Sequence, residues 1–163
     1  MEIYWKSYRF SELSLDDLYD MLRLRAEVFV VEQEVAYQDL DTLDRECHHV
    51  LGRTEQGRLV AYARVMPEGV DAYELIGEGD SHHGSIGRVV VAQDSRGIGH
   101  QLMDKAIEVY NREIGNLPCI IHAQAHLKHF YEAHGFRKTS GICIIDGIDH
   151  IEMTREGSTG PIS

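Results

Sequence analysis

Three segments of the chain repeat apolar residues at the three- and four-residue spacings of a helix. They are residues 15–30, 99–114 and 127–134. Ser14 would cap the first helix, and Gly135 would end the third as a left-handed cap. The same spacing predicts the inward residues Leu15, Leu18, Leu22, Arg25, Ala26 and Phe29 in the first helix and Leu102, Ala106, Val109 and Tyr110 in the second.

Shorter apolar runs bounded by turn residues predict strands. They cover residues 3–8, 48–54, 59–66, 85–91, 119–123, 136–145 and 149–154. The run Val89-Val90-Val91 is apolar on both faces, which places its strand centrally in a sheet. Gln56-Gly57 and Asp146-Gly147 would turn two hairpins. The order β-α-ββ-β-α-β-α-ββ predicts an α/β fold, a mixed sheet with helices on its faces.

Segments without periodicity predict loops. Residues 67–83 read as a surface loop, and residues 157–163 as a disordered tail behind a single domain of residues 1–156. Residues 31–46 predict a loop with one helical turn, either solvated or lining a pocket that attracts a cation. This segment holds six acids, Glu32, Glu34, Asp39, Asp41, Asp44 and Glu46.

Composition narrows the class of protein. The 163 residues are 43% hydrophobic and 26% charged, as in a soluble globular protein, and no apolar run is long enough to cross a membrane. The net charge of −11 without any basic cluster excludes a nucleic-acid partner and favours cationic substrates such as amines. Three distant cysteines fit a reducing cytoplasm, with Cys119 and Cys143 expected to be buried thiols.

Ten histidines raise the question of a metal site. His126 and His129 lie one helical turn apart, but no nearby carboxylate or thiol completes a zinc shell. His122 and His126 straddle the boundary between a strand and a helix, so they share no face. We therefore predict no metal.

The turn Arg96-Gly97-Ile98-Gly99 follows a buried strand and opens a helix. Free amides at a helix start and the helix dipole attract anions, and glycines let a diphosphate approach closely. The turn lacks the third glycine of a dinucleotide fingerprint and the Gly-Lys-Ser of a Walker loop. On its own it predicts either a tight turn or an anion site.

Stretches along nearly the whole chain resemble the GCN5-related N-acetyltransferase (GNAT) family, and within it the ElaA-like subgroup. They are residues 24–33, 61–65, 86–91, 101–103, 123–127, 130–131, 135–136, 146–148 and 150–151. The resemblance implies an acyl-CoA N-acyltransferase fold, in which two central parallel strands splay apart to admit the arm of the cofactor. The cofactor it implies is acetyl-CoA.

The resemblance also implies where acetyl-CoA binds. The strand ending at Val91 would pair with the pantetheine arm, and the amide of Val89 or Val90 would polarise the thioester carbonyl. The diphosphate would lie on the turn and helix start, formed by Arg96, Gly97, Ile98, Gly99, His100 and Gln101. Gln124 stands where many members carry an asparagine that contacts the cofactor.

The glycine turn departs from the family pattern. One alignment puts Asp94 where glutamine or arginine is usual, and the other makes the loop about two residues short. Either way, fewer amides reach the phosphates, which predicts weaker cofactor binding.

Candidate catalytic residues follow from the resemblance and from the chemistry of acyl transfer. Tyr131 matches the family tyrosine that protonates the departing thiolate. Glu27, expected to be partly buried near the end of the first helix, is the predicted base. Alternatives are Glu32, His49, Glu74 or a water relay. Tyr131 also fits a purely structural role in the core.

The predicted function is N-acetyl transfer from acetyl-CoA to a primary amine, on a small molecule or a protein, by direct attack. Cys119 lies in an apolar strand and makes a poor nucleophile for a covalent route. The alternative is a non-catalytic module that keeps the fold as a CoA-binding or interaction protein. Pairing of the C-terminal edge strands would allow a homodimer.

Overall fold

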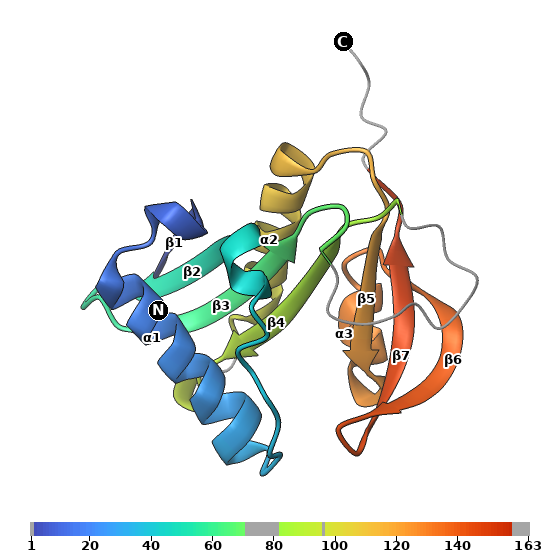
Figure 1. The fold of residues 1–163 in the computed structure, drawn as a ribbon, viewed down its shortest axis with the longest axis horizontal. Helices are drawn as coiled ribbons and strands as arrows, with labels where there is room; N and C mark the ends of the chain where they lie inside the picture. The colour runs from blue at the N-terminus through green and yellow to red at the C-terminus, as the bar shows by residue number, and fades with distance from the viewer. Residues whose placement is uncertain (1, 71–81, 96, 158–163) are drawn as a thin grey trace.

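Two antiparallel sheets lie side by side in the computed structural model, which describes residues 2–70, 82–95 and 97–157 (Figure 1). The first sheet has the order β1-β2-β3-β4, and the second the order β5-β7-β6. The strands are β1 (Ile3–Arg9), β2 (His48–Thr54), β3 (Leu59–Met66), β4 (Ser85–Val91), β5 (Cys119–Gln124), β6 (Arg137–Ile145) and β7 (Ile148–Arg155).

The two sheets touch where β4 and β5 begin. The Gly84 amide donates to the Pro118 carbonyl at 3.1 Å, and the Ile120 amide donates to the Gly84 carbonyl at 3.0 Å. Gly84 and Cys119 form a parallel bridge there, beyond which β4 and β5 diverge (Figure 1). The predicted α/β fold with two central parallel strands that splay apart is therefore present, although every pair inside each sheet is antiparallel.

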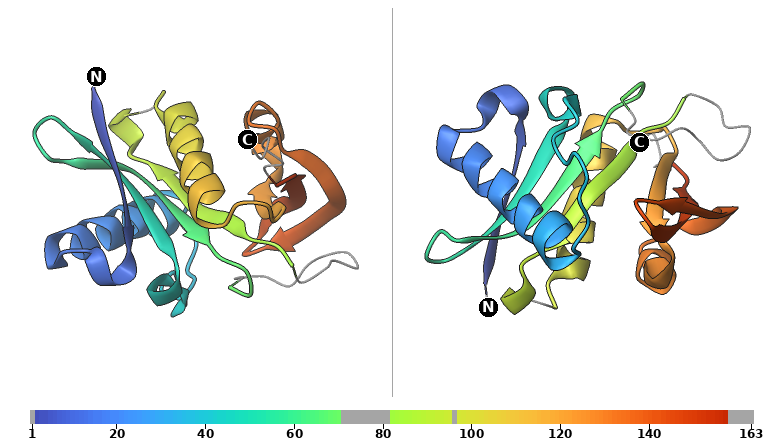
Figure 2. Two further views of the ribbon diagram at one scale, coloured as in Figure 1. Left: turned by 90° about the horizontal axis from the view of Figure 1, so that it is seen from above. Right: turned by 60° about the horizontal axis from the view of Figure 1, so that its bottom comes forward.

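Helices cover both faces of the first sheet (Figures 1 and 2). α1 (Leu15–Arg25) lies on one face and continues as a π-helix, η2 (Ala26–Glu32), while α2 (Gly99–Glu113) lies on the other. α3 (Lys128–Glu132) packs beside the second sheet after the 3-10 turn η5 (Ala125–Leu127). Short 3-10 turns complete the set: η1 (Phe10–Glu12), η3 (Leu43–Glu46) and η4 (Gln93–Ser95).

The hydrophobic core is centred on β3, in which all residues are buried. α2 contributes the four predicted inward residues and Met103, all of them buried. The helical turn expected within residues 31–46 is present as η3, and Gly135 adopts the left-handed φ of 88° expected of a cap. Among the helices that the structure describes, none combines the length and the apolar run needed to cross a bilayer.

The predicted inward stripe of the first helix was partly wrong. Leu15 is 85% exposed and Ala26 is also exposed, whereas Met21 and Leu24 are buried together with Arg25. Spacings of three and four residues connect these buried positions as well, so the stripe is rotated around the helix. Arg25 is inward as predicted, and its buried side chain binds Asp39 and Asp44.

Two further expectations, a central strand at Val89–Val91 and a buried Cys143, were wrong. β4 is the last strand of its sheet, and Val89 and Val91 are only partly buried because they line an open cleft. Cys143 is only partly buried because β6 is an edge strand. Most of the predicted 67–83 loop and of the 157–163 tail lies outside the described residues.

Candidate active site

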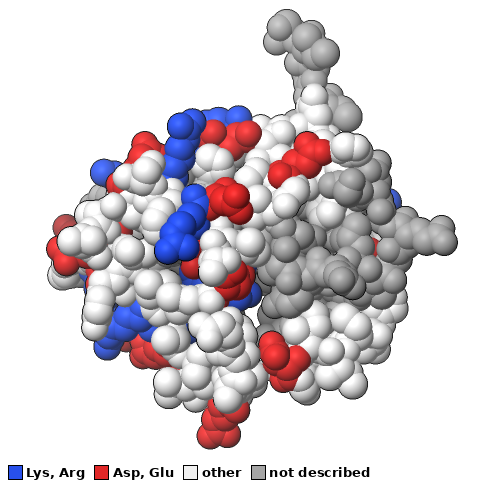
Figure 3. All heavy atoms as spheres, in the orientation of Figure 1, with Lys and Arg blue, Asp and Glu red and all other residues white. Residues whose placement is uncertain are grey.

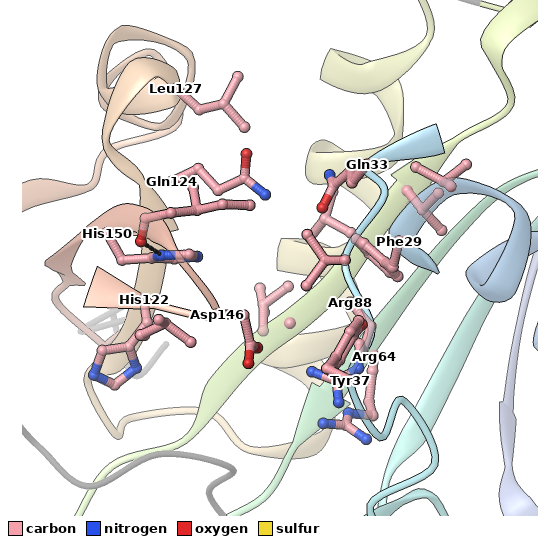
Figure 4. Close-up of a pocket in the computed structure, with 18 of the residues that line it drawn as sticks. Phe29, Gln33, Tyr37, Arg64, Arg88, His122, Gln124, Leu127, Asp146 and His150 are labelled. Carbon is pink, nitrogen blue, oxygen red and sulfur yellow. Dashed lines mark hydrogen bonds between the residues drawn. The ribbon is translucent and has the colours of Figure 1, made fainter. Parts of the chain in front are cut away.

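A cleft with a volume of about 290 Å³ opens between the diverging strands β4 and β5 (Figure 4). One wall is β4, from Ser85 to Val91, with Arg64 of β3 behind it. The opposite wall is formed by β5, η5, Tyr131 of α3 and the β6–β7 turn. η2 and the loop that follows it close one side. The cleft brings together Val89, Val90, Val91, Gln124 and Tyr131 from the predicted site.

β4 carries a bulge in the wall of this cleft. Tyr62 pairs with Val90 and Arg64 pairs with Gly87, so one residue of β3 faces two residues of β4. Arg88 has a φ of 50°, a left-handed conformation that favours a break in the strand. A bulge leaves its extra residue outside the ladder of hydrogen bonds. Backbone groups near Val89 are therefore directed away from β3.

Tyr131 lines the opposite wall of the cleft. Its side chain packs edge-on against Phe130 and Phe136, and only 8% of the residue is exposed. Burial raises the pKa of its hydroxyl to about 12. Within the described part of the chain, its hydroxyl has no hydrogen-bond partner. The tyrosine therefore combines a role in the core with a protonated hydroxyl at the cleft.

Gln124 ends β5 on the same wall, and its amide points into the cleft (Figure 4). Phe29 and Gln33 lie across the gap on η2 and just after it. The cleft thus has an amide donor, Gln124, on the β5 side, and an apolar and a polar side chain, Phe29 and Gln33, on the opposite side.

A buried ion network supports the β4 side of the cleft. It joins three arginines from three different elements to three aspartates of the acidic segment: Arg25, Arg64 and Arg88 with Asp39, Asp41 and Asp44. Asp39 accepts from Nε of Arg25 at 3.0 Å and from Nε of Arg88 at 2.9 Å. Asp44 accepts from Nη1 of Arg25 at 2.8 Å and from Nη1 of Arg64 at 3.0 Å. The formal charges of the six residues cancel.

The acidic segment is therefore neither a solvated loop nor a free cation site at these positions. Val35 and Tyr37 do line the cleft, and the Arg88 guanidinium lies 5.6 Å from the centre of the Tyr37 ring. The carboxylates, however, are used to hold the segment against β3 and β4. Sequence periodicity could not show that these carboxylates bind arginines of the sheet, because the partners lie far apart in the chain. Asp39 and Arg88, for example, are 49 positions apart.

Two carboxyl groups of the network make stability depend on pH. Burial alone would raise the pKa of Asp41 and Asp44, but hydrogen bonds and charges of Arg64 and Arg25 outweigh it and lower both pKa values below 3.8. A lowered pKa adds stability above the unfolded value that is lost as pH falls through the folded value. We expect the free energy of unfolding from urea melts to fall steeply below about pH 4.

Asp41→Asn should flatten this pH dependence, and Asp149→Asn, an exposed substitution, should leave it unchanged. A free energy of unfolding in the wild type that stays constant from pH 5 to pH 2 would contradict the assignment.

The glycine turn follows β4 beyond the cleft. Gly97 has a φ of 104°, where a side chain would be strained, and Gly99 begins α2. Ile98 is the N-cap with its side chain in the core, and no side chain caps the helix start. His100 and Gln101 are exposed in the first turn, whereas Arg96 lies outside the described residues. The amides of the first turn are available to an anion.

Asp94 does not face this turn as an isolated negative charge. Its carboxylate accepts two hydrogen bonds from Arg58, at 2.7 Å and 2.9 Å. These hydrogen bonds lower the pKa of Asp94, so the pair stays ionised at neutral pH. Arg58 thereby compensates the acid that departs from the family pattern.

Removing Arg58 should weaken cofactor binding. In Arg58→Ala the Asp94 carboxylate loses its partner beside the predicted diphosphate site, and the Kd for CoA should rise roughly two- to fivefold at low salt. Isothermal titration at two salt concentrations measures the change, which should shrink as salt increases. Arg58→Ala with Asp94→Asn should recover the wild-type Kd, and Arg112→Ala is the surface control. An unchanged Kd at low salt would exclude this role.

The described candidates for a general base lie away from the cleft. Glu27 is 48% exposed rather than buried, lies 4.0 Å from Arg23, and lines a separate small pocket with Arg58. Glu32 is exposed, and Glu74 lies outside the described residues. His49 is fully buried between the Tyr62 hydroxyl and the Asp44 carbonyl, and burial lowers its pKa to about 4. The cleft wall contains none of the described members of this set.

The β6–β7 hairpin supplies polar side chains that were not among the predicted site residues. Asp146 and His150 line the cleft, and both are labelled in Figure 4. Both belong to stretches that carry the family resemblance. The resemblance, together with the turn at Asp146-Gly147, was the feature of the sequence from which these two cleft residues could have been predicted.

Among the described residues, no three metal-ligating side chains lie close enough together to hold an ion. The face shown in Figure 3 carries interspersed positive and negative residues rather than a continuous basic patch of described residues. The absence of a metal and of a nucleic-acid partner remains a prediction.

The homodimer also remains a prediction. The strand that would pair in it, β6, is the edge strand of its sheet, with Ile142 and Ile144 exposed.

Comparison with known proteins agrees with this geometry. The sequence matches the model of the acetyltransferase (GNAT) domain over residues 17–156. It is 40% identical over 158 residues to protein ElaA of Escherichia coli, spanning 94% of this chain and 97% of that protein. The crystal structure of Escherichia coli ElaA has a TM-score of 0.81 and covers 95% of this chain and 100% of its own.

A second solved structure is also similar over nearly the whole chain. An acyl-CoA N-acyltransferase from Pseudomonas aeruginosa is 36% identical, with a TM-score of 0.83, and covers 93% of this chain and 99% of its own. The splayed strands, the bulge of β4 and the glycine turn thus occur in a chain that is similar to these proteins over nearly its whole length. This chain belongs to the GNAT family of acetyltransferases and is ElaA-like.

Proposed function

We propose that this protein is an N-acetyltransferase that transfers an acetyl group from acetyl-CoA to a primary amine by direct attack. The observation that carries the proposal is the cleft between β4 and β5, which places a bulged strand opposite Tyr131. Direct attack is favoured because Cys119 of β5 is only 2% exposed, which leaves its thiol poorly accessible as a nucleophile.

The β4 wall would hold the thioester. The pantetheine arm would lie along Val89 to Val91, with its carbonyl oxygen accepting from the amide of Val89 or Val90 near the bulge. Amides fixed in place stabilise the negative charge that develops on this oxygen during attack. Gln124 would donate to the arm from the opposite wall, and residues 96–101 would hold the diphosphate.

Tyr131 would act on the leaving group. As the amine nitrogen bonds to the carbonyl carbon, the carbon–sulfur bond breaks and the sulfur needs a proton. Burial keeps the Tyr131 hydroxyl protonated at neutral pH, since its pKa is raised to about 12. The hydroxyl can therefore donate to the thiolate throughout the physiological range.

Two measurements test the proposal. Acetyl-CoA should raise the melting temperature, because a ligand bound only to the native state stabilises it. Adding amines from a panel of small molecules and peptides should then release free CoA thiol. A rise in melting temperature without thiol release from any amine would instead support a non-catalytic CoA-binding module. No rise at all would contradict cofactor binding.

A further inference from the structure

The β6–β7 hairpin carries an imidazole and a carboxylate into the cleft on the side opposite the β4 bulge. His150 of β7 lies opposite Gln124 in the β5–β7 ladder and opposite Cys143 in the β6–β7 ladder. Both His150 and Asp146 line the cleft, as Gln124 does. The hairpin is thus continuous with the wall that also includes Tyr131.

A hydrogen bond fixes the tautomer of His150. Its Nδ1 lies 2.8 Å from the Ile148 carbonyl oxygen, which can only accept, so Nδ1 carries the hydrogen. In the neutral ring, Nε2 then has a free lone pair. Figure 4 shows this end of the ring directed into the cleft. A neutral imidazole held this way can accept a proton from a molecule in the cleft.

The neighbouring histidine on β5 is placed differently. His122 has a side chain that is only 3% exposed, and its Nε2 lies 3.9 Å from a carboxylate oxygen of Glu152. Its ring is directed away from Gln124 and His150 (Figure 4). Of the two labelled histidines, His150 is the one with a lone pair on the cleft.

Asp146 gives the cleft its charge. The guanidinium groups of Arg64 and Arg88, together with that of Arg25, are matched by Asp39, Asp41 and Asp44, so the network contributes no net charge. The Asp146 carboxylate has no ion-pair or hydrogen-bond partner among the residues that the structure describes. Its side chain points from the turn into the space facing Arg64 and Arg88 (Figure 4). An unmatched carboxylate in a cleft attracts a cation.

We propose that His150 is the general base of acyl transfer and that Asp146 guides a cationic amine to it. This inference rests on the proposed function. The acceptor enters as an ammonium ion near Asp146, and Nε2 of His150 takes one proton from it. The freed lone pair attacks the thioester carbonyl, the carbon–sulfur bond breaks, and the thiolate takes a proton from Tyr131. The nitrogen then gives up its second proton to solvent, which leaves a neutral amide, and the tyrosinate and the imidazolium return to their starting states by exchange with solvent. The acceptor class is an amine that is protonated in water, without a negative group beside the nitrogen.

The first test needs no acceptor. Long-range proton–nitrogen NMR of the acetyl-CoA complex at pH 8 should show His150 with a protonated Nδ1 and an unprotonated Nε2. His150→Gln identifies the signals. A proton on Nε2 at this pH would overturn the proposal, because that nitrogen could not act as the base.

The second test is kinetic and uses the best amine of the panel. His150→Gln should lower kcat about 100-fold at pH 7, the usual range for loss of a general base, with an unchanged Kd for acetyl-CoA. The deficit should shrink as pH rises, since the amine then loses its proton without help. His48→Gln, outside the cleft, is the matched control. A fully active His150→Gln with the wild-type pH profile would overturn the proposal.

Asp146 is tested through KM. Asp146→Asn should raise KM for the cationic amine roughly fivefold and leave kcat nearly unchanged. Asp149→Asn, on the same hairpin but outside the cleft lining, should change neither. An unchanged KM in Asp146→Asn would overturn the guiding role. Failure of the proposed function would appear differently, as a wild-type protein that releases no thiol with any amine.

Discussion

Tyr131→Phe should lower kcat about 100-fold or more while leaving the fold and the Kd for acetyl-CoA close to wild type. The substitution removes only the hydroxyl, and the ring keeps its packing against Phe130 and Phe136. Because the pKa of Tyr131 is raised to about 12, the hydroxyl is protonated from pH 6 to pH 9, and the loss should be constant across that range. Steady-state thiol release measures it.

This pH-independent loss separates the role of Tyr131 from that of His150, whose replacement should matter less as pH rises. Tyr8→Phe, which removes a hydroxyl from a core-packed ring outside the cleft, is the control. Wild-type turnover in Tyr131→Phe would show that the tyrosine only packs the core.

Arg25→Ala should cost about 3–5 kcal/mol of unfolding free energy, the usual result of breaking a buried ion pair. The Arg25 side chain is 0% exposed and binds both Asp39 and Asp44. Its loss leaves two buried carboxylates with fewer positive partners and opens a cavity beside Met21 and Leu24. A domain of ordinary stability would lose a large part of its 5–15 kcal/mol. Urea denaturation at pH 7 measures the loss.

Two further variants assign the cause. Arg25→Met fills most of the cavity, so any loss that remains comes from the unmatched carboxylates. Arg53→Ala removes an arginine that also binds two aspartates, but that is 24% exposed, and it should cost about 1 kcal/mol or less. Equal losses in Arg25→Ala and Arg53→Ala would mean that burial of the network does not determine its contribution.

The strands were the part of the fold that local sequence predicted best. β2 and β3 occupy the predicted ranges, because their apolar runs end at turn residues. The hairpin turn at Asp146-Gly147 was predicted by turn chemistry, and both residues adopt left-handed φ values of 52° and 78°. These features depend on neighbours in the chain, which the sequence displays directly.

The active-site side chains were predicted unevenly for a physical reason. The resemblance to the family placed Tyr131 and Gln124 on the cleft, since both match positions of the family pattern. The base was predicted from an expected burial of Glu27, but the Glu27 side chain is 48% exposed. Local periodicity also could not show that Arg25, two positions earlier, binds aspartates 14 and 19 positions away.

The sharing of Asp39 between Arg25 and Arg88 has a consequence for redesign. Any substitution that shifts the 33–46 loop would also move the strand that is proposed to hold the thioester, so acceptor preference and acyl transfer would change together. The β6–β7 hairpin belongs to the other sheet, and among the described residues no hydrogen bond or ion pair joins its tip to the 33–46 loop. Altering the accepted amine without slowing the chemistry should therefore start from the turn at Asp146.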